Sequence, residues 1–177
     1  MKRSKQLKLV VMGLSPFVLS ACGERPVDAL IYETVEQCAG DKYYDLSRCQ
    51  AEHDKALSNH AKYAPRYKSR YDCEYDFGSH ACDSSGAQYT PKMSAFMMPM
   101  PVGSSRYGSV VSQPLYTSRD DFSRYRTTTN STVGTVGQVG KTATTASKAS
   151  TPKVRTTTVS RGGFGSQAAA RGGWGSS

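Results

Sequence analysis

Five cysteines carry the most distinctive chemistry in this 177-residue sequence. Cys22 follows a short apolar stretch, and the other four lie further along the chain: Cys38, Cys49, Cys73 and Cys82. A thiol can be acylated, pair as a disulfide or bind a metal ion, and the compartment that the chain enters decides between these fates. The role of the cysteines therefore depends on the residues before Cys22.

The N-terminus has the composition of an export signal. An apolar stretch covers residues 9–19, and four basic residues precede it: Lys2, Arg3, Lys5 and Lys8. This order is typical of a signal peptide. A stretch of this length is too short for a helix that crosses a bilayer, which needs about 20 apolar residues. We therefore predict that residues 1–21 are a signal peptide rather than a membrane anchor.

The end of this signal resembles the lipobox of bacterial lipoproteins, on the residues Leu19-Ser20-Ala21-Cys22. The resemblance implies that Cys22 is acylated on sulfur, becomes the N-terminus after cleavage and is acylated again on nitrogen. Several acyl chains give a stable anchor, and residues 22–27 would form the lipidated N-terminus and its tether. Gly23 stands where an aspartate would resemble an inner-membrane retention signal. We expect a periplasm-facing outer-membrane lipoprotein, with the inner membrane and the cell surface as alternatives.

The four remaining cysteines predict two disulfides, because an even number in an exported chain favours pairing. Four cysteines allow three pairings. A weak internal repeat favours the local one: residues 34–38 and 69–73 each place Thr or Ser three positions before Gln or Asp, which Cys38 or Cys73 follows. Each copy is typical of a helix start, with Thr34 or Ser69 as the cap. Cys49 and Cys82 come next in each case, so we prefer Cys38 with Cys49 and Cys73 with Cys82. A zinc site built from Cys73, His80 and Cys82 with another cysteine is less favoured, since the chain has no Cys-x-x-Cys spacing and an oxidising periplasm favours disulfides.

These cysteines belong to a predicted helical module over residues 28–83. Ser47 is expected to cap a helix over residues 48–63, and Ser69 a second helix over residues 70–77 that ends at Gly78. One face of the first helix carries a stripe of mostly small side chains: Cys49, His53, Ala56, Leu57, His60 and Ala64. A module of this size has little to bury, so we expect it to depend on its disulfides.

Residues 84–122 are predicted to be an irregular segment that contains methionine, proline and tyrosine. Its methionine cluster consists of Met93, Met97, Met98 and Met100. Thioethers are soft ligands that suit Cu(I), so copper handling is an alternative function. We favour an apolar hinge, because prolines interrupt any compact site. Further along, Leu115 and Tyr116 could form a short anchor on the module.

Residues 123–177 are predicted to be a disordered basic tail. Ser, Thr and Gly make up 29 of these 55 residues, and no acidic residue follows Asp121. Leu115 is the last leucine, and Ile31 is the sole isoleucine of the chain. Such a segment lacks the aliphatic surface that offsets about 1–2 kcal/mol of backbone entropy per ordered residue. The predicted fold class is thus a mostly disordered chain with a small α-helical, disulfide-stapled module behind a lipoprotein signal peptide.

The tail ends in two copies of one motif, Arg161-Gly-Gly-Phe164-Gly and Arg171-Gly-Gly-Trp174-Gly. The side chains that we expect to bind a partner are Arg161, Phe164, Arg171 and Trp174. Arginine, glycine and aromatic residues also occur in single-stranded nucleic acid binders, but export argues against nucleic acid. In the envelope the same groups could meet lipid phosphates, peptidoglycan carboxylates or the sheet edge of a protein partner.

The sequence offers no catalytic apparatus and no cofactor motif. Residues 103–106 lack the second glycine of a nucleophile elbow, and there is no phosphate-binding loop. The acidic residues of the module are spread along its predicted helix surfaces. We therefore expect a protein that is not an enzyme and assign no catalytic residue and no metal site.

Taken together, these features resemble the YgiB-like uncharacterised bacterial lipoproteins, a family defined as a domain of unknown function. The residues that carry the resemblance are Cys22, Cys38, Cys49, 64–67, 72–74, 77–78, Cys82, the cluster around Phe96, 113–116 and 157–165. Here the middle is shorter than in the family and a second Arg-Gly-Gly-Trp-Gly copy is added. The resemblance implies the layout of an envelope lipoprotein with a binding or structural role, and it implies no activity.

Overall fold

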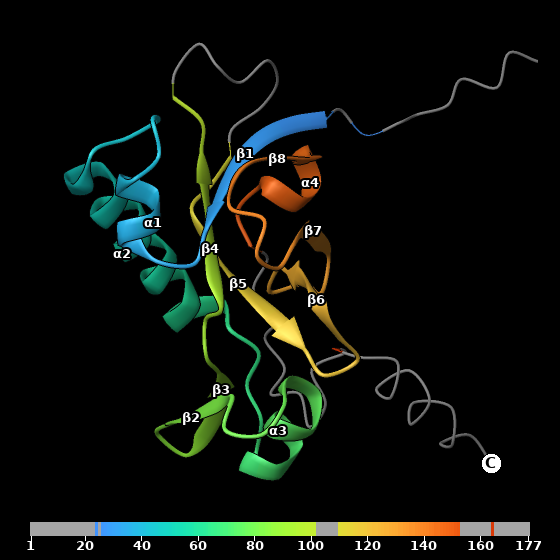
Figure 1. Cartoon of the computed structure of the whole chain (residues 1–177). Helices are drawn as coiled ribbons and strands as arrows, with labels where there is room; N and C mark the ends of the chain where they lie inside the picture. Colours follow the sequence, from blue (N-terminus) through green and yellow to red (C-terminus); the bar gives the residue numbers. More distant parts are fainter. Residues whose placement is uncertain (1–23, 25, 102–109, 153–163, 165–177) are drawn as a thin grey trace, which may run out of the picture.

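Figure 1 shows the computed structural model of the chain, which describes residues 24, 26–101, 110–152 and 164. Strands predominate within these residues. The elements in chain order are β1 (Pro26–Tyr32), α1 (Val35–Ala39), α2 (Leu46–Tyr63), α3 (Arg70–Phe77), β2 (Cys82–Ser85), β3 (Gln88–Pro91), β4 (Ala95–Pro99), β5 (Gln113–Ser118), β6 (Asp121–Arg126), β7 (Thr132–Thr135), β8 (Gly140–Thr145) and α4 (Ala146–Ala149). None of the described helices is both long and apolar enough to cross a bilayer.

The main element is a six-stranded antiparallel sheet in the order β7-β6-β5-β4-β1-β8. The sheet curls until its two outermost strands, β7 and β8, lie against each other. Gly134 of β7 makes this closure possible, because a Cβ there would stand 2.8 Å from Cδ1 of Ile31 in β1. A residue without a side chain allows that close approach.

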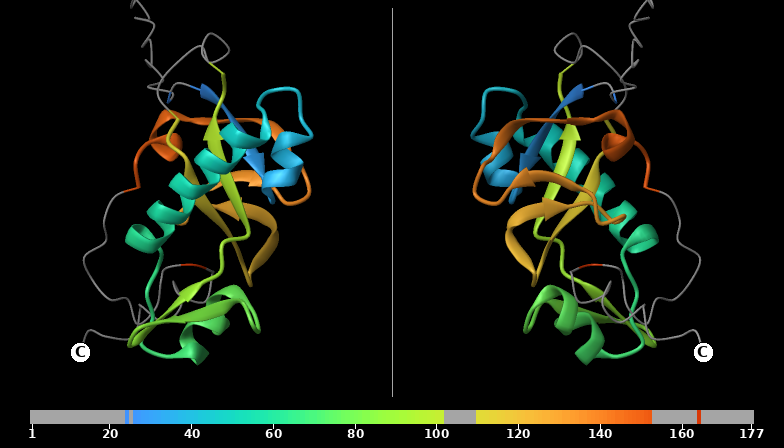
Figure 2. Two further views of the ribbon diagram at one scale, coloured as in Figure 1. Left: turned by 90° about the vertical axis from the view of Figure 1, so that its left-hand side faces the viewer. Right: turned by 90° about the vertical axis from the view of Figure 1, so that its right-hand side faces the viewer.

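Alternate residues of the central strands face two different cores, as the period of a β-strand requires. Ala29 and Ile31 of β1 join Met97 inside the curl. Leu30 and Tyr32 face the opposite side, where α1 and α2 cover them. Figure 2 shows α2 running diagonally across that face of the sheet. A third cluster lies at one end of the molecule, under α3 and the β2–β3 hairpin.

The helix boundaries mostly follow the predicted caps. The Thr34 side chain accepts a hydrogen bond from the Gln37 amide in a capping box, and Ser69 caps α3 over the predicted residues 70–77. The cap of α2 was predicted wrongly. Asp45 replaces Ser47, since the Asp45 carboxylate accepts from the Arg48 amide at 2.8 Å. The core stripe predicted on one face of α2 was also partly wrong, because it includes Leu57, which is 42% exposed.

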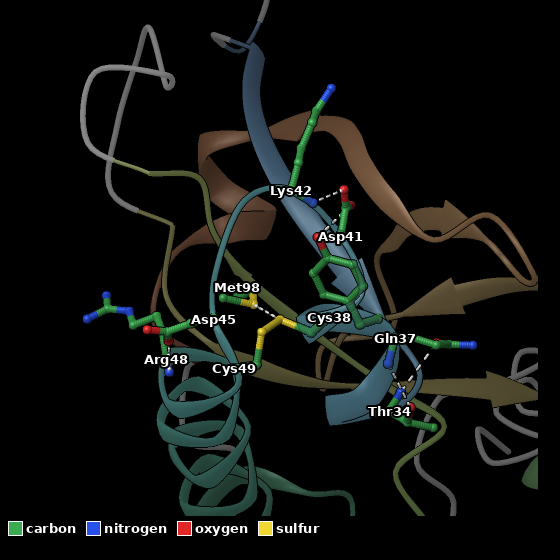
Figure 3. Close-up of a disulfide and its surroundings, with 10 residues drawn as sticks. Thr34, Gln37, Cys38, Asp41, Lys42, Asp45, Arg48, Cys49 and Met98 are labelled. Atoms are coloured by element: carbon green, nitrogen blue, oxygen red, sulfur yellow. Dashed lines mark hydrogen bonds between the residues drawn. A yellow bond between two sulfur atoms is a disulfide. The ribbon is translucent and has the colours of Figure 1, made fainter.

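Both disulfides join the cysteines of the preferred local pairing, and Figure 3 shows the Cys38–Cys49 bridge. Cys38–Cys49 connects α1 to α2 across a Cα–Cα distance of 5.8 Å, and Cys73–Cys82 connects α3 to β2 across 6.2 Å. All four residues are buried. Because Cys73 and Cys82 are paired, neither offers a thiolate to the zinc site considered above.

The predicted fold class is wrong. The protein is a sheet structure with helices against it, rather than a mostly disordered chain with a small helical module. Residues 84–122, expected to be irregular, supply the end of β2, all of β3 to β5 and the start of β6. Residues 123–152, expected to be disordered, complete β6 and form β7, β8 and α4.

The error has a physical cause. Large polar-tipped side chains fill the core where aliphatic ones are scarce, and their hydroxyl groups have partners. Tyr125 is 1% exposed and donates to Glu33 at 2.5 Å, while Tyr32 is equally buried and donates to Asp41 at 2.9 Å. Burial raises the pKa of both tyrosines, so both donate as neutral phenols. A count of leucine and isoleucine misses this kind of core.

Gly134 provides a direct test of the closed sheet. We expect Gly134→Ala to lower the free energy of unfolding by about 1–3 kcal/mol, because the added methyl group collides with Ile31. The control is Thr135→Ala at the next, exposed position of β7, with an expected change within about 0.5 kcal/mol. Urea unfolding followed by circular dichroism measures both. Equal stability of the two variants would contradict the closure around Ile31.

Candidate functional site

Phe164, one of the four residues predicted to bind a partner, is buried in the folded body and is 1% exposed. Its ring centroid lies 4.8 Å from that of Phe77 and 6.2 Å from that of Tyr116. The first pair is tilted and the second meets edge to face, which are favourable aromatic arrangements. We call the group that receives Phe164 the aromatic socket: Tyr67, Phe77 and Tyr116, with Ala64 and the Cys73–Cys82 disulfide.

Each wall of the aromatic socket comes from a different part of the chain. Phe77 is the last residue of α3, and its ring packs edge to face against Tyr67 at 6.0 Å. Tyr67 pairs its backbone with Tyr89 of β3 and donates its hydroxyl to Asp76 at 2.9 Å. Tyr116 lies in β5 of the main sheet. The socket therefore joins the α3–hairpin end of the molecule to the sheet.

Polar side chains on one face of α2 fix the position of β5 and hence of Tyr116. Asn59 donates to the Ser112 carbonyl at 2.7 Å, and His60 Nδ1 shares a hydrogen bond of 2.9 Å with the Tyr116 hydroxyl. Burial raises the pKa of Tyr116 and lowers the pKa of His60, so a neutral phenol meets a neutral imidazole at pH 7. This wall of the socket therefore contributes no charge.

Glu52 makes the strongest contact in this row. Its carboxylate is 1% exposed and accepts a hydrogen bond from the Ser112 hydroxyl. Arg48 and Lys55 approach the same carboxylate at 2.7 and 2.9 Å. Burial by itself raises the pKa of Glu52, but the hydrogen bond and the two cations outweigh it and leave the pKa below its usual value. A charged, fully paired carboxylate thus fastens α2 to the strand that carries Tyr116.

An exposed aromatic surface lies beside the aromatic socket. Phe122 is 54% exposed, and its ring packs over Gly78, where a Cβ would stand 3.2 Å from it. Tyr71 is 71% exposed and packs against Tyr75, over which the Arg119 guanidinium lies at 5.6 Å. Large exposed rings with a cation among them are typical of binding surfaces.

The structure separates the predicted methionine cluster. Met97 faces the core inside the curl, whereas Met93, Met98 and Met100 belong to the core under α1 and α2. The Met98 sulfur lies 3.6 Å from Sγ of Cys38, which is already bonded to Cys49 (Figure 3). Adjacent residues of a strand point to opposite faces, so the four thioethers do not converge on one point. Met97 therefore lies apart from the other three methionines, which share one core cluster.

Other predicted residues lie outside the described part of the chain. These are the signal peptide, Cys22, Arg161, Arg171 and Trp174. The described residues contain no group of three or more His, Cys, Asp or Glu side chains arranged to hold a metal ion. The socket residues Tyr67 and Phe77 and the anchor Glu52 were not anticipated. The sequence held a signal only for Glu52, because its spacing from Asn59 and His60 places the three on one face of a helix.

The Glu52 contact predicts a pH dependence. Because folding lowers the pKa of Glu52, its contribution is complete above the unfolded value near 4.5 and is lost as the pH falls through the folded value below it. We expect Glu52→Gln to cost about 1–3 kcal/mol at pH 7. The difference from the unsubstituted protein should shrink below about pH 4.5, as urea titrations at several pH values would show.

The control for this variant is Asp54→Asn on the exposed side of α2, where we expect a change within about 0.5 kcal/mol at either pH. A difference between Glu52→Gln and the unsubstituted protein that stayed constant down to pH 3 would contradict the role of a charged Glu52.

Comparison with known proteins places the chain in a family. A family sequence model described as "Protein of unknown function (DUF1190)" matches residues 26–175. A UPF0441 protein of Serratia proteamaculans is 28% identical over 188 residues, covering 94% of this chain and 84% of that protein. A UPF0441 protein of Erwinia tasmaniensis is 29% identical over 187 residues, covering 94% and 83%. UPF0441 protein YE3666 of Yersinia enterocolitica is 27% identical over 196 residues, covering 94% and 83%.

No solved structure matches the chain. The family match confirms the resemblance drawn from the cysteines, the residues around Phe96 and the Phe164 motif, and it adds no activity. With matches that span nearly the whole sequence, the chain belongs to the DUF1190 family of proteins of unknown function, whose curated relatives are the UPF0441 proteins of enterobacteria.

Proposed function

We propose that this protein is a lipid-anchored component of the bacterial envelope with a binding or structural role. In this proposal Cys22 carries the acyl chains, the body faces the periplasm from the outer membrane, and the basic tail contacts an anionic envelope polymer. The observation that carries the proposal is the burial of Phe164 between Phe77 and Tyr116. It makes Phe164, the aromatic residue of the first tail motif, part of the folded protein.

The disulfides support the proposed location in an oxidising compartment. Four buried cysteines form two bridges that connect α1 to α2 and α3 to β2. Stable structural disulfides form in oxidising compartments such as the periplasm. This agrees with the signal and lipobox that precede the body in the sequence.

Charge supports an anionic partner. After Asp121 the sequence has no acidic residue, and residues 153–177 hold four cations: Lys153, Arg155, Arg161 and Arg171. On the body, Lys141 is paired with Asp28 at 2.8 Å and Arg126 lies near Asp120 at 3.6 Å. Asp28 and Asp120 thus already have cationic partners on the body. Peptidoglycan carboxylates fit the tail cations best, and the surface of Tyr71, Phe122 and Arg119 could stack on sugar rings beside them.

Lipidation is tested in cells with radiolabelled palmitate. We expect the unsubstituted protein to take up label and to stay with the membrane fraction, and Cys22→Ser to lose both. Gly23→Asp should keep the label but move the protein from the outer to the inner membrane. Label in the Cys22→Ser protein, or processing of the precursor that globomycin leaves unchanged, would contradict the anchor.

Tail binding is tested by cosedimentation with purified peptidoglycan sacculi, using a soluble chain with Cys22→Ser. We expect Arg161→Gln with Arg171→Gln to weaken retention about tenfold or more, since each cation near an anionic surface contributes about 1 kcal/mol. The matched control is Lys62→Gln with Lys68→Gln, which removes two exposed cations from the body.

Equal loss in the two double variants would show that net charge alone binds the polymer. If anionic vesicles or an envelope protein retained the chain and sacculi did not, peptidoglycan would be excluded as the partner.

A further inference from the structure

The chain contains two copies of a motif and a socket that receives one of them. Residues 161–165 and 171–175 are identical except that Phe164 is replaced by Trp174. Both aromatics are flanked by glycine on both sides and preceded by arginine at the same spacing. Whatever main-chain features let the first copy approach the aromatic socket are therefore repeated in the second.

The socket selects for a flat ring. The ring planes of Phe77 and Phe164 are tilted by 46° to each other, and those of Tyr116 and Phe164 by 81°. The occupant's ring therefore meets one neighbour obliquely and the other edge to face. An indole offers the same negative face and positive edge as a phenyl ring. The Tyr116 hydroxyl is engaged by His60, so it does not require a polar group from the occupant.

We propose that the aromatic socket is a binding site for the Arg-Gly-Gly-aromatic-Gly motif and that residues 171–175 are its second occupant, exchanging with Phe164 in the same chain. Phe164 is the major occupant for two reasons. An indole overfills a site shaped to phenylalanine. The chain from Pro152 also lengthens from 12 to 22 residues, which lowers the effective concentration of the second motif by about 2.5-fold.

Exchange would change how much of the basic tail extends past the body. With Phe164 in the socket, 13 residues follow it, including Arg171. With Trp174 in the socket, three residues follow, and Arg161 lies within the closed loop. The same socket would thus set two different lengths of chain after the bound aromatic residue.

Tryptophan fluorescence tests the exchange, because Trp174 is the sole tryptophan of the chain. The full mature chain with Cys22→Ser is compared with Phe164→Ala, and the exchanged pair Phe164→Trp with Trp174→Phe serves as the reference for an indole in the socket. We expect Phe164→Ala to shift the emission to shorter wavelength and to reduce acrylamide quenching toward that of the reference. Unchanged emission and quenching in Phe164→Ala, beside a protected reference, would overturn the proposal.

Stability gives a second, independent measure. Trp174→Ala should leave the unfolding midpoint unchanged when Phe164 is present, but should lower it when combined with Phe164→Ala. Additive effects would overturn the proposal. If Phe164→Ala does not fold, Phe164→Leu supplies the folded comparison. Partial protection of Trp174 in Phe164→Leu would support exchange, and no protection would contradict it.

Discussion

The structure depends on the burial of β1 on both faces. Ile31 of this strand points into the curl, where Gly134 makes room for it, while Leu30 and Tyr32 point into the core under α1 and α2. The neighbours of β1 are β4 and β8, which come from the middle and the far end of the described sequence. Two separate cores and the closure of the sheet therefore meet in one short strand near the N-terminus.

This arrangement explains which parts of the fold could be predicted from the sequence. Helix starts depend on side chains within four residues, so Thr34 with Gln37 and Ser69 with Asp72 were sufficient to place α1 and α3. The start of α2 was missed because Asp45 and Ser47 are both good caps, and the carboxylate of Asp45 makes the bond. The disulfide pairing also followed from local spacing.

The sheet could not be predicted, because its stabilisation is not local. Thr142 of β8 pairs with Ala29 of β1, and the two lie more than a hundred residues apart in sequence. Strands rich in Thr, Gly and Ser have the same composition as a disordered segment, so they cannot be recognised unless the partner strand is known. The aromatic socket was missed for the same reason, since Phe77 and Phe164 are brought together only by the completed fold.

The Cys73–Cys82 disulfide and the burial of Phe164 are physically linked. At eight residues α3 is too short to be stable by itself, because isolated helices below about 12–15 residues are marginal in water. The Cys73–Cys82 bridge ties this helix to β2, and the helix in turn presents Phe77 to Phe164. Reduction of that bridge would remove the covalent support of one wall of the aromatic socket. The burial of Phe164 is thus coupled to the disulfide, because the bridge supports the helix whose last residue forms that wall.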